Sequence, residues 1–118
     1  MARILLVDDE AEFCNAFREF LVRRKHTVFI ANHGTRALEI LREERPDALV
    51  IDIRMPGMDG REVLKKARET DKNSVILVVT AIGDAGLKKE IMELGATGLL
   101  QKPVNLLEVC KLIEDKIG

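Results

Sequence analysis

Polar side chains that could share one site follow four apolar segments of this sequence. Asp8 and Asp9 follow RILLV, Asp52 follows ALVI, Thr80 follows VILVV and Lys102 follows TGLLQ. If these segments are strands of one parallel sheet, their carboxyl ends lie at the same edge, where open α/β sheets bind their ligands. We therefore expect three carboxylates, a hydroxyl and an ammonium to converge on one point.

This set of groups suits phosphoryl transfer. Three close carboxylates repel one another, which raises at least one pKa unless a cation neutralises them. A hard divalent cation with oxygen ligands, most simply Mg²⁺, fits such a cluster. With the metal bound, Asp52 can act as a nucleophile toward phosphorus. Thr80, Lys102 and nearby backbone N–H groups can then stabilise the oxygens of the transferring phosphoryl group.

Each residue also has a structural interpretation when it is considered alone. Adjacent acids such as Asp8 and Asp9 commonly cap a helix and complement its dipole. A single Thr80 at a strand end would usually be structural, and a single Lys102 would usually be a solvated charge. Their joint position at the matching ends of four strands favours a shared site.

Other polar residues receive no role in this site. Glu10 is interpreted as a charge at a helix start, and Asp59 as the cap of a helix that begins at Gly60. His33 stands beside a glycine in a loop and is expected to face solvent. His26 receives no functional assignment.

The chain alternates short β-favouring segments with segments of helical periodicity. Strands are predicted at 3–7, 27–31, 47–52, 75–79 and 97–101. Helices are predicted at 10–24, 60–69, 87–94 and 106–117, with Gly95 ending the helix at 87–94. A further helix is predicted between a cap at Thr35 and Pro46. This βα order predicts a parallel sheet buried on both faces, with right-handed crossovers. The expected fold is the flavodoxin-like (βα)5 three-layer sandwich with strand order 2-1-3-4-5.

Composition narrows the class of protein. The chain of 118 residues fits one domain, 1–118, and its 19 basic and 20 acidic side chains nearly balance, which favours neither a nucleic-acid nor a membrane partner. Four Phe, with no Tyr or Trp, argue against a stacking surface for single-stranded nucleic acid. No apolar run is long enough to span a bilayer and no signal peptide is recognisable, so a cytoplasmic location is expected. Cys14 and Cys110 are interpreted as reduced packing residues.

Four motifs, LLVDDE, VIDIRMPGMDG, VVTA and GATGLLQKP, resemble in order and spacing the receiver domain of two-component response regulators, the CheY-like family. The resemblance covers essentially the whole chain. It implies that Asp52 is the phosphoacceptor and receives phosphoryl from a histidine kinase or a phosphotransfer protein. It also implies that Mg²⁺ is bound directly by Asp9, Asp52 and the backbone carbonyl of Arg54, and through water by Asp8.

The resemblance extends to the phosphoryl-binding and switch residues. Thr80 would hydrogen-bond the phosphoryl group, Lys102 would pair with it, and the bond from Lys102 to Pro103 would be cis. Leu99 stands where many receivers carry the aromatic residue of the switch, so the motion that transmits the signal is left open.

Two further positions bear on the lifetime of the phosphoryl group. Arg54 and Ile82 occupy positions that in the family influence how readily water reaches the acyl phosphate. We hypothesise that Ile82 shields the phosphoryl group.

An interaction surface is suggested by the last helix. Leu107 and Leu112 lie away from its apolar stripe and could face solvent, either as scattered apolar residues or as part of a partner or homodimer face. Such a face resembles the output surface that the family forms on helix four, strand five and helix five. The expected partner is an output domain or protein.

The leading interpretation is a signalling switch that only assists its own phosphorylation and dephosphorylation, and is otherwise not an enzyme. One alternative is a haloacid-dehalogenase-like phosphatase, although that family places a second aspartate where this chain has Arg54. The other is a pseudo-receiver that binds partners without phosphorylation.

Overall fold

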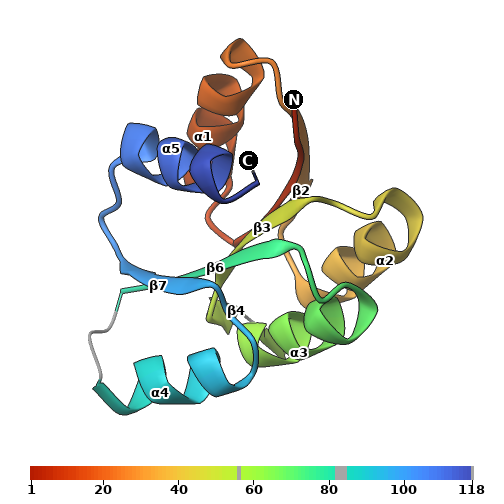
Figure 1. Cartoon of the computed structure of the whole chain (residues 1–118), viewed down its shortest axis with the longest axis vertical. Helices are drawn as coiled ribbons and strands as arrows, with labels where there is room; N and C mark the ends of the chain where they lie inside the picture. The colour runs from red at the N-terminus through yellow and green to blue at the C-terminus, as the bar shows by residue number, and fades with distance from the viewer. Residues whose placement is uncertain (56, 82–84, 118) are drawn as a thin grey trace.

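The computed structural model describes residues 1–55, 57–81 and 85–117, in which helices cover both faces of a five-stranded sheet (Figure 1). The strands of this sheet are β1 (Arg3–Val7), β2 (Thr27–Ala31), β3 (Ala48–Asp52), β6 (Val75–Thr80) and β7 (Gly98–Gln101), and the helices are α1 (Ala11–Arg23), α2 (Gly34–Glu44), α3 (Gly60–Thr70), α4 (Ala85–Glu93) and α5 (Leu106–Ile117). All four strand pairings are parallel, in the order β2-β1-β3-β6-β7. The predicted flavodoxin-like arrangement is confirmed.

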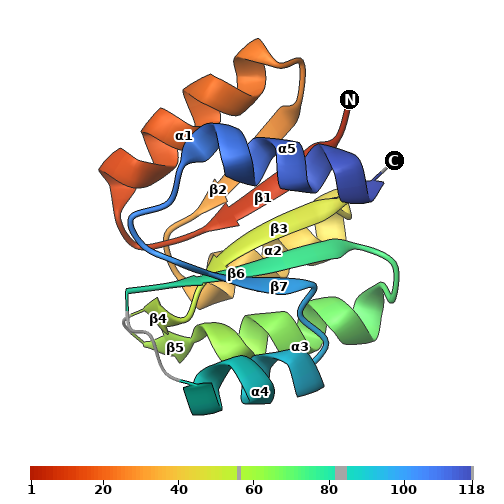
Figure 2. The ribbon, with the colours of Figure 1, turned by 60° about the vertical axis from the view of Figure 1, so that its left-hand side comes forward.

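The sheet separates two hydrophobic clusters. Helices α1 and α5 cover one face, and α2, α3 and α4 cover the other (Figures 1 and 2). Phe17 and Leu21 of α1 and Ile113 of α5 are fully buried on the first face. Burial of each such side chain contributes roughly 1.5–3 kcal/mol relative to exposure. Because every residue of β3 and β6 is buried, these central strands hold their carboxyl ends in fixed positions.

A short hairpin that the sequence pattern did not predict follows β3. Strands β4 (Arg54–Met55) and β5 (Met58–Asp59) pair antiparallel and lead directly into α3. The hairpin lies at the carboxyl edge of the sheet, beside the start of α3 (Figure 2). Two-residue strands are too short to show an apolar alternation, which explains why the prediction missed them.

Gly60 fixes the position of α3 against the end of β3. A Cβ atom at this position would lie 2.3 Å from the carbonyl oxygen of Asp52, so no other residue fits this approach. The N–H of Gly60 donates to the carbonyl of Ile53 at 2.9 Å. Asp59 caps the helix, as predicted, by accepting from the N–H of Arg61 at 2.8 Å.

The cap of α2 differs from the prediction. His33, rather than Thr35, is the N-cap, and its Nδ1 accepts from the N–H of Arg36 at 3.3 Å. The His33 side chain is exposed, as expected for this loop. After the last turn of α4, Gly95 ends the helix with a positive φ of 107°, as predicted.

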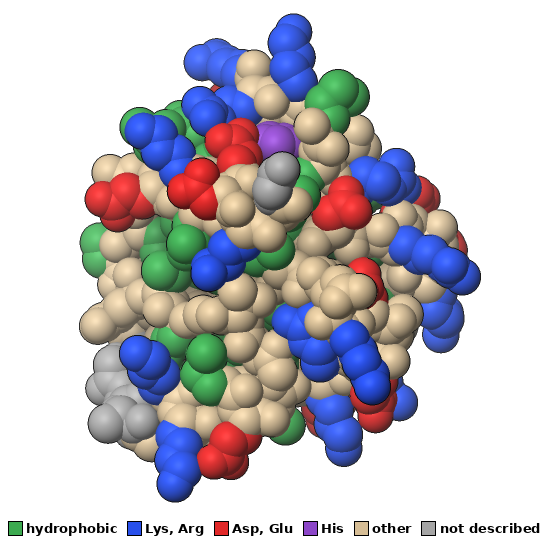
Figure 3. Space-filling model, viewed as in Figure 1, with side chains coloured by type: hydrophobic (Ala, Val, Ile, Leu, Met, Phe, Trp, Pro, Cys, Tyr) green, Lys and Arg blue, Asp and Glu red, His purple; other side chains and the backbone are tan. Residues whose placement is uncertain are grey.

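Charged side chains of both signs are interspersed over the face shown in Figure 3. This distribution agrees with the near balance of acidic and basic residues in the sequence. None of the helices within the described ranges has the length and apolarity that a membrane span requires.

Candidate phosphoryl-acceptor site

The carboxyl edge of the sheet brings together polar residues from four strands. Asp8 follows β1, Asp52 and Thr80 end β3 and β6, and Lys102 follows β7. Asp8, Asp52 and Thr80 are 3%, 9% and 1% exposed, which is unusual for polar side chains. Their burial is set by the sheet, because each belongs to or directly follows a central buried strand.

The Lys102 ammonium is the cation of this cluster. Its Nζ donates to Oδ2 of Asp8 at 2.8 Å, contacts the Glu10 carboxylate, and lies 3.7 Å from Oδ2 of Asp52. It also lies 4.8 Å from the centre of the Phe13 ring, within cation–π range. Burial lowers the pKa of Lys102, but the hydrogen bonds to Asp8 and Glu10 outweigh that effect and leave the pKa raised.

Asp52 has an elevated pKa in this setting. Burial is the largest cause, and the negative charges of Asp8 and Asp9 add to it. The N–H of Arg54, which donates to Oδ1 of Asp52 at 3.2 Å, and the charge of Lys102 act in the opposite direction. A positive charge brought close to Asp52 would therefore favour the ionised form that a nucleophile requires.

Local hydrogen bonds fix the turn that carries Asp8. Its Oδ1 accepts from the N–H of Glu10 at 2.9 Å, while its backbone carbonyl accepts from the side-chain amide of Asn32 at 2.9 Å. The Cys14 thiol also donates to this carbonyl at 3.5 Å. These bonds fix Asp8 at the carboxyl edge of the sheet, in the turn that precedes α1.

A backbone hydrogen bond fixes Lys102 at the end of β7. Its N–H donates to the carbonyl of Thr80 at 2.7 Å, which joins the ends of β6 and β7. The Lys102–Pro103 peptide bond is cis, as the resemblance implied. The Lys102 side chain extends from the loop between β7 and α5 to Asp8 and Asp52.

The carboxylates that converge differ from the set that the sequence suggested. Oxygens of Asp8, Glu10 and Asp52 all lie within 4.8 Å of one another and could hold a metal ion, whereas Asp9 is exposed and is not one of the three. Glu10 was interpreted only as a charge at a helix start. It is the N-cap residue of α1, but its side chain makes no capping hydrogen bond and contacts Lys102 instead.

Comparisons with known proteins assign the family. A family model described as the response regulator receiver domain matches residues 4–114. The chain belongs to the response regulator receiver domain family. The family's function is phosphorylation-dependent two-component signalling, and the match assigns the chain to receivers rather than to haloacid-dehalogenase phosphatases.

Relatives of this receiver domain include a protein of similar length and longer proteins. Sporulation initiation phosphotransferase F of Bacillus subtilis (strain 168) is 36% identical over 107 residues, which cover 91% of this chain and 86% of that protein. Response regulator MprA of Mycobacterium ulcerans (strain Agy99) is 39% identical over 107 residues, which cover 91% of this chain and 46% of MprA. The chain thus spans about half the length of MprA.

Solved structures confirm the fold of this receiver domain. A CheY-like receiver domain protein from Methanospirillum hungatei JF-1 superimposes with a TM-score of 0.94 at 26% identity, covering 99% of this chain and 94% of that one. Chemotaxis protein CheY4 of Vibrio cholerae gives a TM-score of 0.90 at 32% identity, with 98% of each chain covered.

Other residues singled out in the sequence lie around the site of this receiver domain. Arg54 is exposed on β4, and Leu99 is half-buried against the cluster formed with α2, α3 and α4. Ile82 lies outside the described residues. Leu107 is 41% exposed, as expected, whereas Leu112 packs partly against the core instead of facing solvent fully.

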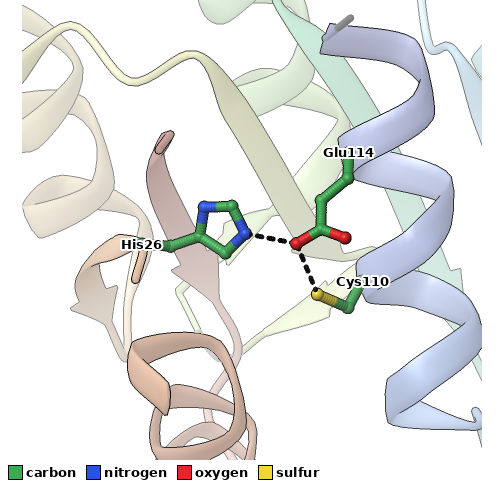
Figure 4. Close-up of side chains that lie close together, drawn as sticks. All are labelled: His26, Cys110 and Glu114. Carbon is green, nitrogen blue, oxygen red and sulfur yellow. Dashed lines mark hydrogen bonds and ion pairs between the residues drawn. The ribbon is translucent and has the colours of Figure 1, made fainter. Parts of the chain in front are cut away.

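A second polar cluster joins the end of α1 and the loop that follows it to α5, near the amino edge of the sheet. Glu114 of α5 accepts from Arg24 through both oxygens at 2.7 and 3.1 Å, and its Oε2 lies 2.7 Å from Nε2 of His26 (Figure 4). The Cys110 thiol donates to the same oxygen at 3.5 Å. The bond to Arg24, followed by that to His26, lowers the pKa of Glu114 to about 2.

His26 therefore has a structural role that the sequence did not indicate. Its ring is buried, and Nδ1 accepts from the N–H of Ala2 at 3.0 Å. The Nε2 atom must then carry the proton and donate to Glu114. Although His26, Cys110 and Glu114 have side chains that bind metals, the ring presents an N–H to the cluster, and Arg24 already supplies the cation. The arrangement is a closed hydrogen-bond network.

Both cysteines fit the packing role predicted for them. Cys14 and Cys110 are free and buried. Burial, with a smaller contribution from the charge of Asp8, raises the pKa of Cys14 to about 12, and burial likewise raises the pKa of Cys110. Neither thiol has the lowered pKa of a reactive cysteine.

Proposed function

We propose that Asp52 accepts a phosphoryl group in a Mg²⁺-dependent reaction and that the phosphorylated receiver changes its interactions with partners. The observation that carries the proposal is the position of the Lys102 ammonium beside buried Asp8 and Asp52, within 2.8 and 3.7 Å of their carboxylates. An acceptor carboxylate and a cation for the phosphoryl oxygens are then present at one sheet edge, and buried Thr80 lies at the end of the neighbouring strand.

The acidic residues suit Mg²⁺. They offer hard oxygen donors, and two of the proposed residues, Asp8 and Asp52, belong to the three carboxylates that converge within 4.8 Å, whereas Asp9 enters the proposal from the resemblance alone. We propose that Asp52, Asp9 and the backbone carbonyl of Arg54 hold the ion directly, with Asp8 acting through water. When bound, the ion supplies positive charge to the acceptor carboxylate and to the transferring oxygens.

The chain's own residues then perform the transfer. An ionised oxygen of Asp52 forms a bond to phosphorus while the bond from phosphorus to the donor breaks, and the donor atom keeps that electron pair. Lys102 and the Thr80 hydroxyl stabilise the negative oxygens of the phosphoryl group. The same groups assist hydrolysis, so catalysis by this domain is limited to its own phosphorylation state.

The donor is a histidine kinase or a phosphotransfer protein in this proposal. An apolar groove of about 520 Å³, lined mainly by Phe13, Pro103, Val104 and Leu106, lies directly beside Lys102. A donor protein that presents a phosphohistidine to Asp52 could bury apolar side chains in this groove. The proposal includes a cytoplasmic location for this transfer.

The output face is proposed to lie on α4, β7 and α5. Met92 of α4 and Leu107 of α5 are each 41% exposed, and together they offer apolar contacts to an output domain or to a second copy of the chain. Light scattering with and without a phosphoryl mimic tests the homodimer. A mass that stays monomeric under both conditions would remove it from the proposal.

The proposed acceptor is tested by incubation with acetyl phosphate and Mg²⁺ followed by intact-mass analysis. We expect one phosphoryl adduct on the wild type and none on Asp52→Asn. Asp115→Asn is the matched control, because Asp115 is an exposed aspartate on α5, and it should be labelled like the wild type. Equal labelling of Asp52→Asn would contradict the proposal, and a folded wild type that takes no label would support the pseudo-receiver instead.

A further inference from the structure

Lys102 is held on the α1 side of the site rather than at Asp52. Three groups near the start of α1 surround its Nζ: Asp8 at 2.8 Å, the Glu10 carboxylate in direct contact, and the Phe13 ring at 4.8 Å. The Asp52 oxygen is farther away, at 3.7 Å. The ammonium therefore makes its shortest contacts with residues other than Asp52.

The two carboxylates that hold Lys102 differ in how easily they can release it. The Asp8 side chain is 4% exposed, and its other oxygen is bonded to the N–H of Glu10. A buried carboxylate that lost its cation would remain poorly solvated, which is costly. The Glu10 side chain is 61% exposed and would be solvated by water on release. Glu10 is consequently the partner that Lys102 can exchange.

We propose that Glu10 is a positioning residue that holds Lys102 away from Asp52 until a phosphoryl group replaces it as the partner of the ammonium. The inference rests on the proposed role of Asp52. Glu10 and the phosphoryl group compete for the same Nζ, while Asp8 keeps its bond throughout. Glu10 thereby sets how tightly the site binds a phosphoryl group.

The size of the effect follows from the exposure of the Glu10 carboxylate, the solvated member of the pair. Measured contributions of exposed ion pairs correspond to a change in an equilibrium constant of up to about five-fold. Removal of Glu10 should therefore tighten the binding of a phosphoryl mimic by about two- to five-fold. Because the competition acts on Lys102 alone, the melting temperature should change little.

Three variants separate the contact from the charge. Glu10→Gln removes both the charge and the ion pair, whereas Glu10→Asp keeps the charge and shortens its reach by one methylene. Glu12→Gln removes an exposed charge two residues away, at a residue that is not among the groups described around Nζ of Lys102. The apparent Kd for beryllium fluoride in excess Mg²⁺ is measured by amide NMR titration, since the chain has no Trp or Tyr for fluorescence. The Kd for Mg²⁺ alone is measured in the same way.

We expect tighter beryllium fluoride binding for Glu10→Gln and Glu10→Asp than for Glu12→Gln or the wild type, with a similar Mg²⁺ Kd in all four. Equal Kd values for beryllium fluoride in Glu10→Asp and the wild type would overturn the inference. Loss of Mg²⁺ affinity in Glu10→Gln would also overturn it, because Glu10 would then act as a metal ligand. A wild type that binds no beryllium fluoride would instead remove the proposed function, and the inference with it.

Discussion

Two polar clusters of this receiver domain have opposite charge balances. At the carboxyl edge of the sheet, one ammonium, from Lys102, lies among the carboxylates of Asp8, Glu10 and Asp52. Between α1 and α5, one carboxylate, from Glu114, accepts from Arg24, His26 and Cys110. The first cluster has more negative charge than its cation can balance, whereas in the second cluster donors reach both oxygens of the single carboxylate.

This difference separates binding from stability. A cluster with surplus negative charge is stabilised when a cation arrives, and Asp52 in it has a raised pKa, so the cluster is suited to metal-assisted chemistry. In the second cluster Arg24 already supplies a cation to Glu114, and its bond, followed by that from His26, lowers the pKa of the carboxyl to about 2. We therefore expect substitutions at Lys102 to change chemistry and substitutions at Glu114 to change the free energy of unfolding.

The largest expected effect is that of Lys102→Ala on phosphorylation. The variant loses the charge that is proposed to stabilise the phosphoryl oxygens, so the initial rate of labelling by acetyl phosphate should fall by about 10- to 100-fold. Intact-mass time courses measure this rate. Lys65→Ala, at an exposed lysine of α3, is the control and should react like the wild type. A rate for Lys102→Ala within two-fold of the control would show that the cluster around Lys102 does not act in phosphorylation, which would contradict the contrast between the two clusters.

Glu114→Ala should lower the free energy of unfolding by about 1–3 kcal/mol, because it leaves the buried Nε2–H of His26 without an acceptor. Urea unfolding followed by far-UV circular dichroism measures the change. Asp115→Ala has the same backbone setting at an exposed position and should change stability by much less. If folded Glu114→Ala is labelled by acetyl phosphate at the wild-type rate, the cluster around Glu114 affects stability and not phosphorylation. A slower rate of labelling would contradict this division between the two clusters.

The same stability difference should depend on pH. Since the folded-state pKa of Glu114 is lowered from 4.5 to about 2, its contribution is fully present above the unfolded-state pKa and is lost as the pH falls through the folded-state pKa. The groups that face Glu114 are Arg24, His26 and Cys110. The gap in stability between the wild type and Glu114→Ala should thus narrow between pH 5 and pH 2. A gap that is constant over this range would show that its origin is not the charge of Glu114.

The smallest expected effect is that of Mg²⁺ on the melting temperature. Ten-fold excess over the Kd should raise it by about 4–8 °C through binding to the native state. Asp9→Ala should reduce this rise, whereas Glu12→Ala and Glu114→Ala should retain it. If Asp9→Ala keeps the full rise, the ion is held by the converging carboxylates of Asp8, Glu10 and Asp52 without Asp9.

The sequence predicts the sheet and the candidate acceptor site more completely than it predicts helix caps and side-chain contacts between distant segments. Strands β1 and β2 begin and end at the predicted residues, because short apolar runs between helical segments have few other interpretations. Asp8, Asp52 and Lys102 meet because parallel strands share one carboxyl edge. The pairing of His26 with Glu114, across 88 positions of sequence, depends instead on how α1 packs beside α5, which no local pattern specifies.

Glu10 and His33 show the same limit over shorter distances. An acid at a helix start satisfies the helix dipole in any fold, so its contact with Lys102 follows only from the three-dimensional arrangement. Histidine is a less common N-cap than threonine, and the pattern therefore favoured Thr35 over His33. In both cases several local solutions were chemically acceptable, and tertiary packing selected one.

Localisation of the phosphoryl group tests the central claim most directly. The wild type is labelled with acetyl phosphate and Mg²⁺, reduced with borohydride to trap the acyl phosphate, digested and sequenced by tandem mass spectrometry. We predict one modified residue, Asp52. Modification at Asp8 or Glu10 instead, or at no residue of a fully folded sample, would contradict the account.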